Sequence, residues 1–267
     1  SGGTSVAALF MAGYIPGALW ALACMLVVYI YAKKAGYRSQ TKLTGKEKFN
    51  AFIQALPCLL LIVIVIGGII AGVFTATEGS VVAVVYSLLL SIYGYKSMKW
   101  KDLPEIFRSS AEMTGIIIFL IGVSSIMSWV MAFTNIPTMV SNGLLSISSN
   151  KYVILLMINI ILLVVGTFMD MTPATLIFTP IFLPVCTALG MNTIHFGIML
   201  IFNLCIGTIT PPVGTTLFVG VKVGGVKIET VFKHLLPYFF AIIVVLMLVT
   251  YIPQLSLWLP GLMGYVS

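Results

Sequence analysis

Long apolar runs separated by short polar segments divide this chain. Runs such as LLMINIILLVV and FFAIIVVLMLV are apolar at almost every position and not only along one helical face, which is typical of helices that cross a bilayer. The pattern therefore predicts an all-α polytopic membrane protein. The expected crossings lie at about 7–32, twice within 49–95, at 114–140, as a pair of helices within 152–189, from 196 to 222, and at about 235–259.

The charged residues indicate which side of the membrane each polar segment faces. Only 8% of the residues are charged and 60% are hydrophobic, whereas soluble domains carry roughly one quarter charged residues. The net charge of +7 comes from short basic segments such as KKAGYRSQTKLTGKEK, which is the positive-inside pattern and not that of a nucleic-acid groove. With these segments in the cytoplasm, 13 of the 14 Lys and Arg residues lie inside and Lys151 lies outside.

Two segments, MKWKDLPEIFRSSAEM and GGVKIETVFKHLLP, mix apolar and charged residues at helical spacing. Each predicts a short helix along the cytoplasmic surface. The crossing at 114–140 is expected to be interrupted by the polar patch SSIMSW, and the following SNGLLSISSNK is expected to be an external loop.

A turn near FTATEG, between the two crossings of 49–95, carries its own local signal. Thr75 followed by Glu78 matches the capping box, in which each side chain binds an unpaired amide at a helix start. Glu78 is therefore either a helix cap near the outer surface or, since acids within membranes are costly and often functional, a ligand of an ion or proton.

The segment GTFMDMTPATLIFTP, residues 166–180, places an acid and two prolines in a very apolar region. An ionised side chain at this depth costs at least about 2.5 kcal/mol on insertion scales, so Asp170 is a candidate functional residue. Thr172 is a favoured N-cap and Pro173 a favoured first helical residue, so one helix should end near 168 and another should begin here. The second helix, 174–189, would be about 24 Å long, shorter than the ~30 Å hydrocarbon core. The two helices predict a re-entrant hairpin with its polar tip inside the membrane.

A second interruption, GTITPPVGTT at residues 207–216, begins about 18 Å of helix after His195, near the expected midplane. Two consecutive prolines cannot donate to a helix, so backbone carbonyls of 207–210 should be freed beside the hydroxyls of Thr208, Thr210, Thr215 and Thr216. These hard oxygen donors, together with Asp170, suit a small alkali cation. Paired broken segments at the midplane indicate the ion and substrate site of a secondary transporter.

The first and last spans resemble each other. The segment from Gly2, GGTSVAALFMAGYIPGALWALACMLVVYIY, and the segment from Gly224, GGVKIETVFKHLLPYFFAIIVVLMLVTYIP, each read as a surface helix, a proline and a span. The first is expected to run inward and the second outward, which is the pattern of an inverted repeat. A hairpin and Pro-Pro break matching those at 151–221 would then precede residue 1.

Four segments together resemble the large membrane subunit of TRAP (tripartite ATP-independent periplasmic) transporters. They are GTFMDMTPATLIFTPIFLPV, FGIMLIFNLCIGTITPPVGTTLFV, GVFTATEGSVVAVVYSLLLSIY and the terminal YIPQLSLWLP, and the resemblance covers essentially the whole chain. It implies the C-terminal two thirds of that subunit, either separate from the small membrane subunit or fused to it. It also implies a sodium-driven importer of organic anions, such as sialic acid or a C4-dicarboxylate, in a bacterial inner membrane. The implied architecture is an inverted-repeat elevator, in which a periplasmic substrate-binding protein delivers the anion.

The same resemblance assigns roles to segments and residues of this chain. It implies an arm helix, span and basic loop at 1–48, a scaffold hairpin with an arm helix at 49–113, and a broken span with an external loop at 114–150. It further implies a transport-domain hairpin with a broken helix at 151–221, and a last arm helix with a scaffold span at 222–267. The sodium ligands are expected among Gly166, Asp170, Met171, Thr172, Gly207, Thr208 and Thr210. The substrate is expected to contact Asp170, Thr172, Pro173, Pro211 and Thr215.

Other functions remain as alternatives at this point. A related two-hairpin sodium/dicarboxylate symporter would work without a binding protein. An intramembrane hydrolase is disfavoured because aspartyl chemistry needs two carboxylates in one site, and Glu78 is expected to lie out of reach of Asp170. Metal hydrolysis needs clustered ligands, but His195 and His234 are expected on opposite sides of the membrane. A purely structural subunit would have no need of broken helices.

Overall fold

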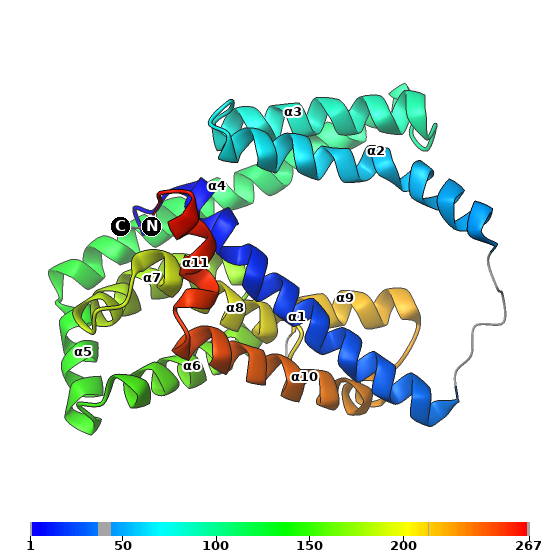
Figure 1. Cartoon of the computed structure of the whole chain (residues 1–267). Coiled ribbons are helices and arrows are strands. Elements are labelled where there is room, and N and C mark those ends of the chain that lie inside the picture. Colours follow the sequence, from blue (N-terminus) through cyan, green and yellow to red (C-terminus); the bar gives the residue numbers. More distant parts are fainter. Residues whose placement is uncertain (1, 37–43, 213, 266–267) are drawn as a thin grey trace. The chain divides into compact units, whose positions relative to one another are not determined.

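The computed structural model describes residues 2–36, 44–212 and 214–265, and its regular elements there are helices (Figure 1). Seven of the helices in these ranges are long and apolar enough to cross a membrane. The all-α polytopic class is therefore confirmed. Residues 37–43, in the middle of the predicted basic loop, lie outside the described ranges. The chain divides into two compact units, Gly36–Ile117 and the combination of Ser1–Ala35 with Ile118–Ser267.

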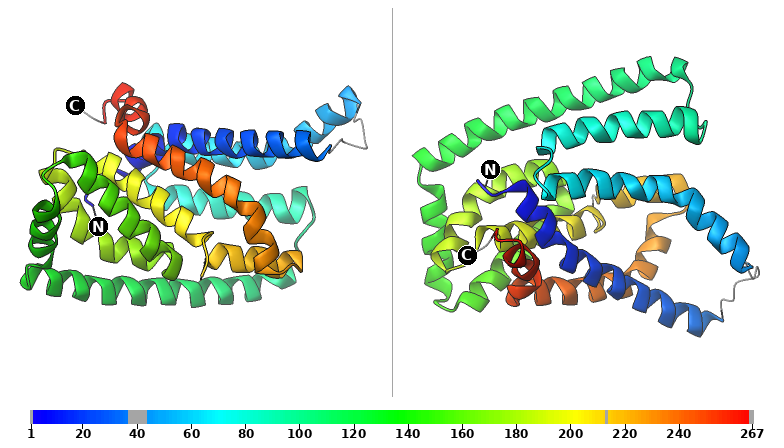
Figure 2. Two further views of the ribbon diagram at one scale, coloured as in Figure 1. Left: turned by 90° about the horizontal axis from the view of Figure 1, so that it is seen from below. Right: turned by 45° about the horizontal axis from the view of Figure 1, so that its top comes forward.

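The unit Gly36–Ile117 begins with the hairpin of α2 (Gly45–Ile70) and α3 (Ala76–Leu89), which lie side by side (Figure 2). The Tyr86 hydroxyl of α3 donates to the Pro57 carbonyl of α2 at 2.8 Å. At the turn, the Thr75 amide and hydroxyl both donate to Oε2 of Glu78, at 2.7 and 2.8 Å, and the Glu78 amide donates to the Thr75 hydroxyl at 3.3 Å. The turn and its capping box are thus confirmed, and the cap interpretation of Glu78 accounts for its contacts.

The next segment corrects a prediction. After a π-helical stretch at Leu90–Gly94 and a short 3-10 turn at Trp100–Asp102, α4 runs without a break from Leu103 to Phe133. The expected surface helix and interrupted span are therefore one helix. Its polar residues do not break it, because the Thr114 and Ser125 hydroxyls donate to carbonyls one turn back, at 2.7 and 2.8 Å.

The expected external loop after α4 is also mostly helical. α5 covers Ile136–Ile147, with Pro137 near its start, where a missing amide costs nothing, and with Leu144 buried. The loop shrinks to residues 148–150 before α6. The prediction was wrong because Val140 and Leu144, one helical turn apart, pack in the core that α5 shares with α7 and outweigh the polar composition of the segment.

The larger unit is built around α6 (Lys151–Phe168) and α8 (Thr193–Thr208), which run in the same direction and pack along their length. α7 (Met171–Ala188) covers α8 and α5, and α9 (Thr215–Gly224) follows α8. The core between α6, α7 and α8 is mostly apolar, with Ile158, Leu162, Met199 and Leu204 at 0% exposure.

Three further helices belong to the same unit. α1 (Val6–Ala35) packs against α8, α10 (Ile228–Tyr251) and α11 (Gln254–Leu262) (Figures 1 and 2). The expected surface helix and last span are one helix, α10, which ends at Tyr251 and not near 259. Pro237 lies inside it, as Pro16 lies inside α1, because neighbouring helices can satisfy the carbonyl that a proline leaves free in a membrane. The two spans that resemble each other in sequence, α1 and α10, are thus both long helices with an internal proline.

Large apolar side chains cover the outer surfaces of these helices. Phe133, Phe240 and Phe119 are 75%, 73% and 70% exposed. In water such surfaces would be unfavourable, whereas in a bilayer they can contact lipid tails. The chain is a multi-pass membrane protein.

Candidate functional site

The polar tip between α6 and α7 consists of Met169 and Asp170. Asp170 is the N-cap of α7, with extended backbone angles and with its Oδ2 accepting from the Thr172 amide at 3.5 Å. The prediction of Thr172 as N-cap and Pro173 as first helical residue was therefore wrong by two positions. Aspartate is as good an N-cap as threonine, and a proline is tolerated anywhere in the first helical turn.

The second interruption is confirmed. α8 ends at Thr208 and α9 begins at Thr215, so the chain is not helical at 209–212 and at 214, and Pro211 and Pro212 carry no backbone N–H. The Thr208 and Thr210 hydroxyls donate to the Cys205 and Ile206 carbonyls at 2.8 and 2.7 Å. Because the two hydroxyl hydrogens are already donated, only the oxygen lone pairs of these side chains could coordinate a cation.

The tip and the break meet in space. The Thr215 hydroxyl, at the first residue of α9, donates to Oδ1 of Asp170 at 3.3 Å. The Gly214 amide donates to the Thr167 carbonyl at the end of α6, at 3.4 Å. Gly214 has a φ of +43°, which favours glycine, and this left-handed turn aims α9 at the tip. Two interrupted segments that are 45 residues apart in the sequence therefore form one polar site.

A close contact of two glycines holds the site together. A Cβ added to Gly166 of α6 would lie 3.1 Å from the Cα of Gly207 in α8, and a Cβ on Gly207 would overlap the backbone of Gly166. Both glycines are buried. Small residues allow helix backbones to approach closely in membranes. Gly166 and Gly207 thus set the distance between the end of α6 and the end of α8.

The other predicted site residues lie around this contact with less direct roles. Met171 Sδ accepts from the Cys205 thiol of α8 at 3.7 Å, so Met171 faces the broken helix. Thr172, Pro173 and Pro211 are half-buried at the tip and the break. The Thr208 and Thr210 side chains are directed to their own helix and not to Asp170. Asp170 itself is exposed, so its carboxylate is open to ligands.

Sequence reasoning missed a buried amide pair two turns from the site. The Asn203 Nδ2 of α8 donates to Asn159 Oδ1 of α6 at 2.6 Å, and the Thr250 hydroxyl of α10 donates to the same oxygen at 3.4 Å. Asn159 and Asn203 are both 0% exposed. Their signal was present, because each is a single amide within an apolar run, as in MINII and IFNLC. The pair fixes the register of α6 against α8.

The donor set at the tip favours a monovalent cation over a transition metal. One carboxylate, hydroxyls and backbone carbonyls are hard oxygen donors. Within the described residues, no group of three or more His, Cys, Asp or Glu lies together. The ends of α6 and α8 present carbonyls to the site, and the starts of α7 and α9 present amides. The arrangement therefore has partial negative charge for a cation and partial positive charge for an anion side by side.

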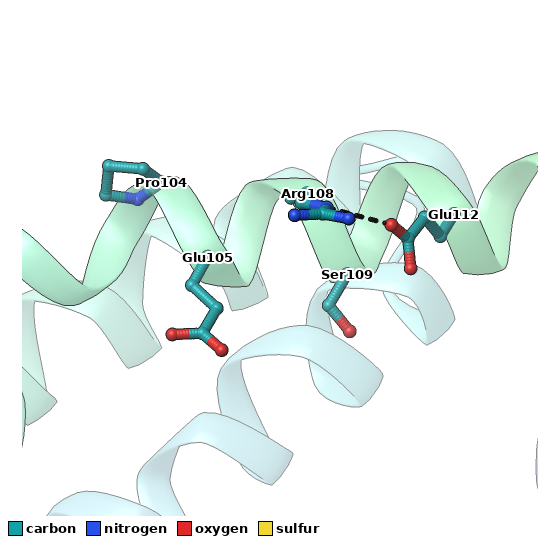
Figure 3. Close-up of a pocket in the computed structure, with 5 residues that line it drawn as sticks. All are labelled: Pro104, Glu105, Arg108, Ser109 and Glu112. Atoms are coloured by element: carbon teal, nitrogen blue, oxygen red, sulfur yellow. Dashed lines mark hydrogen bonds and ion pairs between the residues drawn. The ribbon is translucent and has the colours of Figure 1, made fainter.

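A cavity on α4 offers no comparable arrangement. Figure 3 shows Arg108 and Glu112 one turn apart on the helix, where the Arg108 Nε lies 3.0 Å from Glu112 Oε1. Both side chains are mostly exposed, and exposed pairs at this spacing contribute about 0.3–0.5 kcal/mol at most. The pair stabilises the polar end of α4.

Comparison with known proteins places the whole chain in one group. The sequence profile described as "Tripartite ATP-independent periplasmic transporter, DctM component" matches residues 1–255. The "Uncharacterized protein YgiK" of Salmonella typhimurium is 52% identical over 262 residues, which are 98% of this chain and 60% of that protein. The "Sialic acid TRAP transporter large permease protein SiaM" of Vibrio cholerae is 38% identical over 98% of this chain and 62% of its own length.

A third relative agrees with these. The "C4-dicarboxylate TRAP transporter large permease protein DctM" of Pseudomonas aeruginosa is 37% identical over 98% of this chain and 61% of its own length. The chain thus spans about 60% of the length of the curated relatives it matches. The profile matches nearly every residue, including the helical hairpin and the broken helix that faces it. This match shows that the chain belongs to the DctM family of TRAP transporter membrane components, a family of transporters and not of enzymes.

Proposed function

We propose that the protein is the large membrane subunit of a sodium-coupled secondary transporter that imports an organic anion by an elevator mechanism. The observation that carries the proposal is the 3.3 Å contact between Asp170 at the hairpin tip and Thr215 at the helix break. An acid within an apolar hairpin is costly unless it is paired, and a bound cation would pair it.

Sodium and the anion would bind together for an electrostatic reason. In the proposed site, the Asp170 carboxylate, the carbonyls at the end of α8 and the Thr208 and Thr210 hydroxyls supply oxygens to sodium. The amides at the starts of α7 and α9 point toward the same site and would bind the carboxylate of the anion. Each ion lowers the cost of desolvating the other, which couples their uptake.

The class of substrate follows from the relatives. Two of them, named for sialic acid and for C4-dicarboxylates, are 38% and 37% identical to this chain, so similarity does not separate the two acids. Both substrates carry carboxylates, and helix N-termini recognise carboxylates without selecting the rest of the molecule. We therefore propose an organic anion of this kind as the substrate.

The partners are proposed on the same basis. A small membrane subunit, separate or fused, would cover part of the apolar surface, and a periplasmic binding protein would deliver the anion at the outer face of the inner membrane. In the elevator mechanism, the hairpin and the broken helix would move as one body. The close packing of both hairpin helices, α6 and α7, on α8 supports this part of the proposal.

The test is uptake of labelled sialic acid and succinate into proteoliposomes that contain the complete membrane complex, with the binding protein outside. We expect uptake that requires an inward sodium gradient. Asp170→Asn keeps an N-cap acceptor but removes the charge, and should raise the sodium concentration for half-maximal uptake by roughly 10–100-fold, since hydrogen bonds to charged groups contribute about 1.5–3 kcal/mol. Asp102→Asn is a matched control, because Asp102 also accepts a hydrogen bond from a backbone amide, that of Lys99.

Three results would contradict parts of this proposal. Uptake that is indifferent to sodium refutes the coupling. Equal sodium dependence in Asp170→Asn and Asp102→Asn moves the cation away from the tip. Full uptake without a binding protein favours the related symporter that works alone.

A further inference from the structure

A cavity of about 200 Å³ lies at the other end of α6 from the proposed sodium site. Lys151 and Tyr152 of α6, Asn192 and His195 at the start of α8, and Thr250 and Tyr251 at the end of α10 line it, and the beginning of α11 completes the wall. We call it the outer cavity, because Lys151 marks the side of the membrane opposite to the basic segments. The 18 residues of α6 put about 27 Å between the outer cavity and the hairpin tip.

The outer cavity is electrostatically positive. Lys151 supplies an ammonium group, and none of the lining residues is an acid. α6 and α8 both begin here, after the caps Asn150 and Asn192, and the positive ends of two helix dipoles therefore point at the same space. An anion would be stabilised by all three contributions.

A buried histidine adds a hydrogen-bonding group that the protein leaves unused. His195 is 2% exposed, and its Nε2 lies 2.8 Å from the carbonyl oxygen of Val249, to which it donates. Its Nδ1 has no partner in the part of the chain that the structure describes, and in the neutral imidazole this nitrogen is an acceptor. A hydroxyl group of a ligand would fill this position.

The wall of the cavity is held in place by its own hydrogen bonds. The Tyr251 hydroxyl donates to the Tyr152 carbonyl at 3.0 Å, and the two rings lie 5.7 Å apart. The Thr250 hydroxyl donates to Asn159 Oδ1, which holds the Thr250 side chain in place. These contacts tie α6 to α10 on both sides of the cavity, so the space is preformed.

We propose that the outer cavity binds a small hydroxy acid, with its carboxylate on Lys151 and the amides at the starts of α6 and α8, and its hydroxyl on His195 Nδ1. A volume of about 200 Å³ equals that of about six or seven waters at ~30 Å³ each, which leaves room for a three-carbon hydroxy acid together with water. The site is separate from the hairpin tip, needs no sodium, and stands whether or not the proposed transport function is correct.

The test is binding of L-lactate to the purified membrane complex in sodium-free choline buffer, measured by saturation-transfer NMR and calorimetry. We expect saturable binding that Lys151→Gln weakens at least tenfold, because a charge-assisted contact is lost. Lys222→Gln removes the same charge at the opposite, basic side and should leave binding unchanged. Asp170→Asn should also leave it unchanged, which separates this site from the transport site.

The hydroxyl contact is tested with propionate, which has the carboxylate but no hydroxyl. Wild-type protein should prefer lactate by at least fivefold. His195→Gln retains a donor near the Nε2 position and removes Nδ1, so it should bind the two acids equally. Retention of the Val249 contact is checked by an unchanged unfolding temperature without ligand.

The opposite results overturn the proposal. Absence of saturable lactate binding, or equal binding by wild type and Lys151→Gln, means that the cavity holds water alone. Equal binding of lactate and propionate by wild type removes the histidine from the site. Binding of the complex to vesicles of anionic lipid that Lys151→Gln weakens, with no binding of free lactate, would assign the positive charge to a lipid headgroup.

Discussion

Replacing Gly207 with alanine tests whether the contact between α6 and α8 sets the geometry of the proposed sodium site. The new Cβ would lie 2.6 Å from the Gly166 carbonyl oxygen and closer still to the Gly166 Cα and carbonyl carbon. Backbone atoms cannot rotate away as a side chain can. The two helices must therefore separate by about 1 Å to restore an ordinary contact, and overpacking of this kind costs about 1–3 kcal/mol.

The separation acts directly on the proposed ligands. Gly207 is adjacent to Thr208, and Gly166 lies four residues before Asp170, so a shift of about 1 Å moves the carboxylate away from the broken helix. Displacements of this size can cost about 100-fold where several groups must converge. We expect the sodium concentration for half-maximal uptake to rise by roughly 10–100-fold, and the unfolding temperature in detergent to fall.

The assay is sodium-dependent uptake into proteoliposomes, with thermal unfolding in detergent as a second measurement. Gly166→Ala should have a smaller effect, since its Cβ would lie 3.1 Å from the Gly207 Cα and a few tenths of an ångström of movement relieve it. Gly17→Ala is the control, because a Cβ at Gly17 of α1 meets no described atom within 4 Å. A normal sodium dependence in Gly207→Ala, or a larger effect in Gly166→Ala, would show that the contact does not position the site.

Three further predictions concern other parts of the chain. Asn203→Leu should leave the buried Asn159 amide without its partner and cost about 1–3 kcal/mol in detergent unfolding, whereas the double change with Asn159→Leu should recover part of that loss; additive losses would contradict the pairing. Thr75→Ala should lower the free energy of unfolding by about 1 kcal/mol, because it removes the N-cap of α3. Glu78→Gln should leave the sodium dependence of uptake unchanged, because Glu78 caps a helix; a shifted sodium dependence would instead make Glu78 an ion ligand. In a variant without native cysteines, Lys151→Cys should react with an impermeant maleimide added from outside to intact cells, and reaction from the cytoplasmic side alone would reverse the topology.

The sequence by itself determined the class of the protein and the position of its irregular segments. Runs that are apolar on every face predict helices that cross the bilayer, because a helix forms its backbone hydrogen bonds within itself. The end of α6 lies near 168 as predicted, since the apolar run that begins after Asn150 ends before the polar MDMT. The break after Thr208 was predicted because two prolines remove two donors whatever surrounds them.

Sequence reasoning was less successful where a polar group could be satisfied locally. α4 and α10 were predicted as two pieces each, and both are continuous. In α4, Ser125 returns its hydroxyl to the preceding turn, and in α10 the chain passes through Pro237. Composition does not distinguish a serine that bonds its own helix from one that ends it. The choice of Asp170 over Thr172 as the N-cap was likewise a competition between two good caps.

Only the tertiary structure decided which oxygen atoms meet. The contact of Asp170 with Thr215, the approach of Gly166 to Gly207 and the amide pair of Asn159 with Asn203 join residues more than 40 positions apart. No local pattern specifies such pairs, because they depend on how far each helix slides along its neighbour. The packing of α6 on α8 sets that register, and with it the distance between the carboxylate and the broken helix.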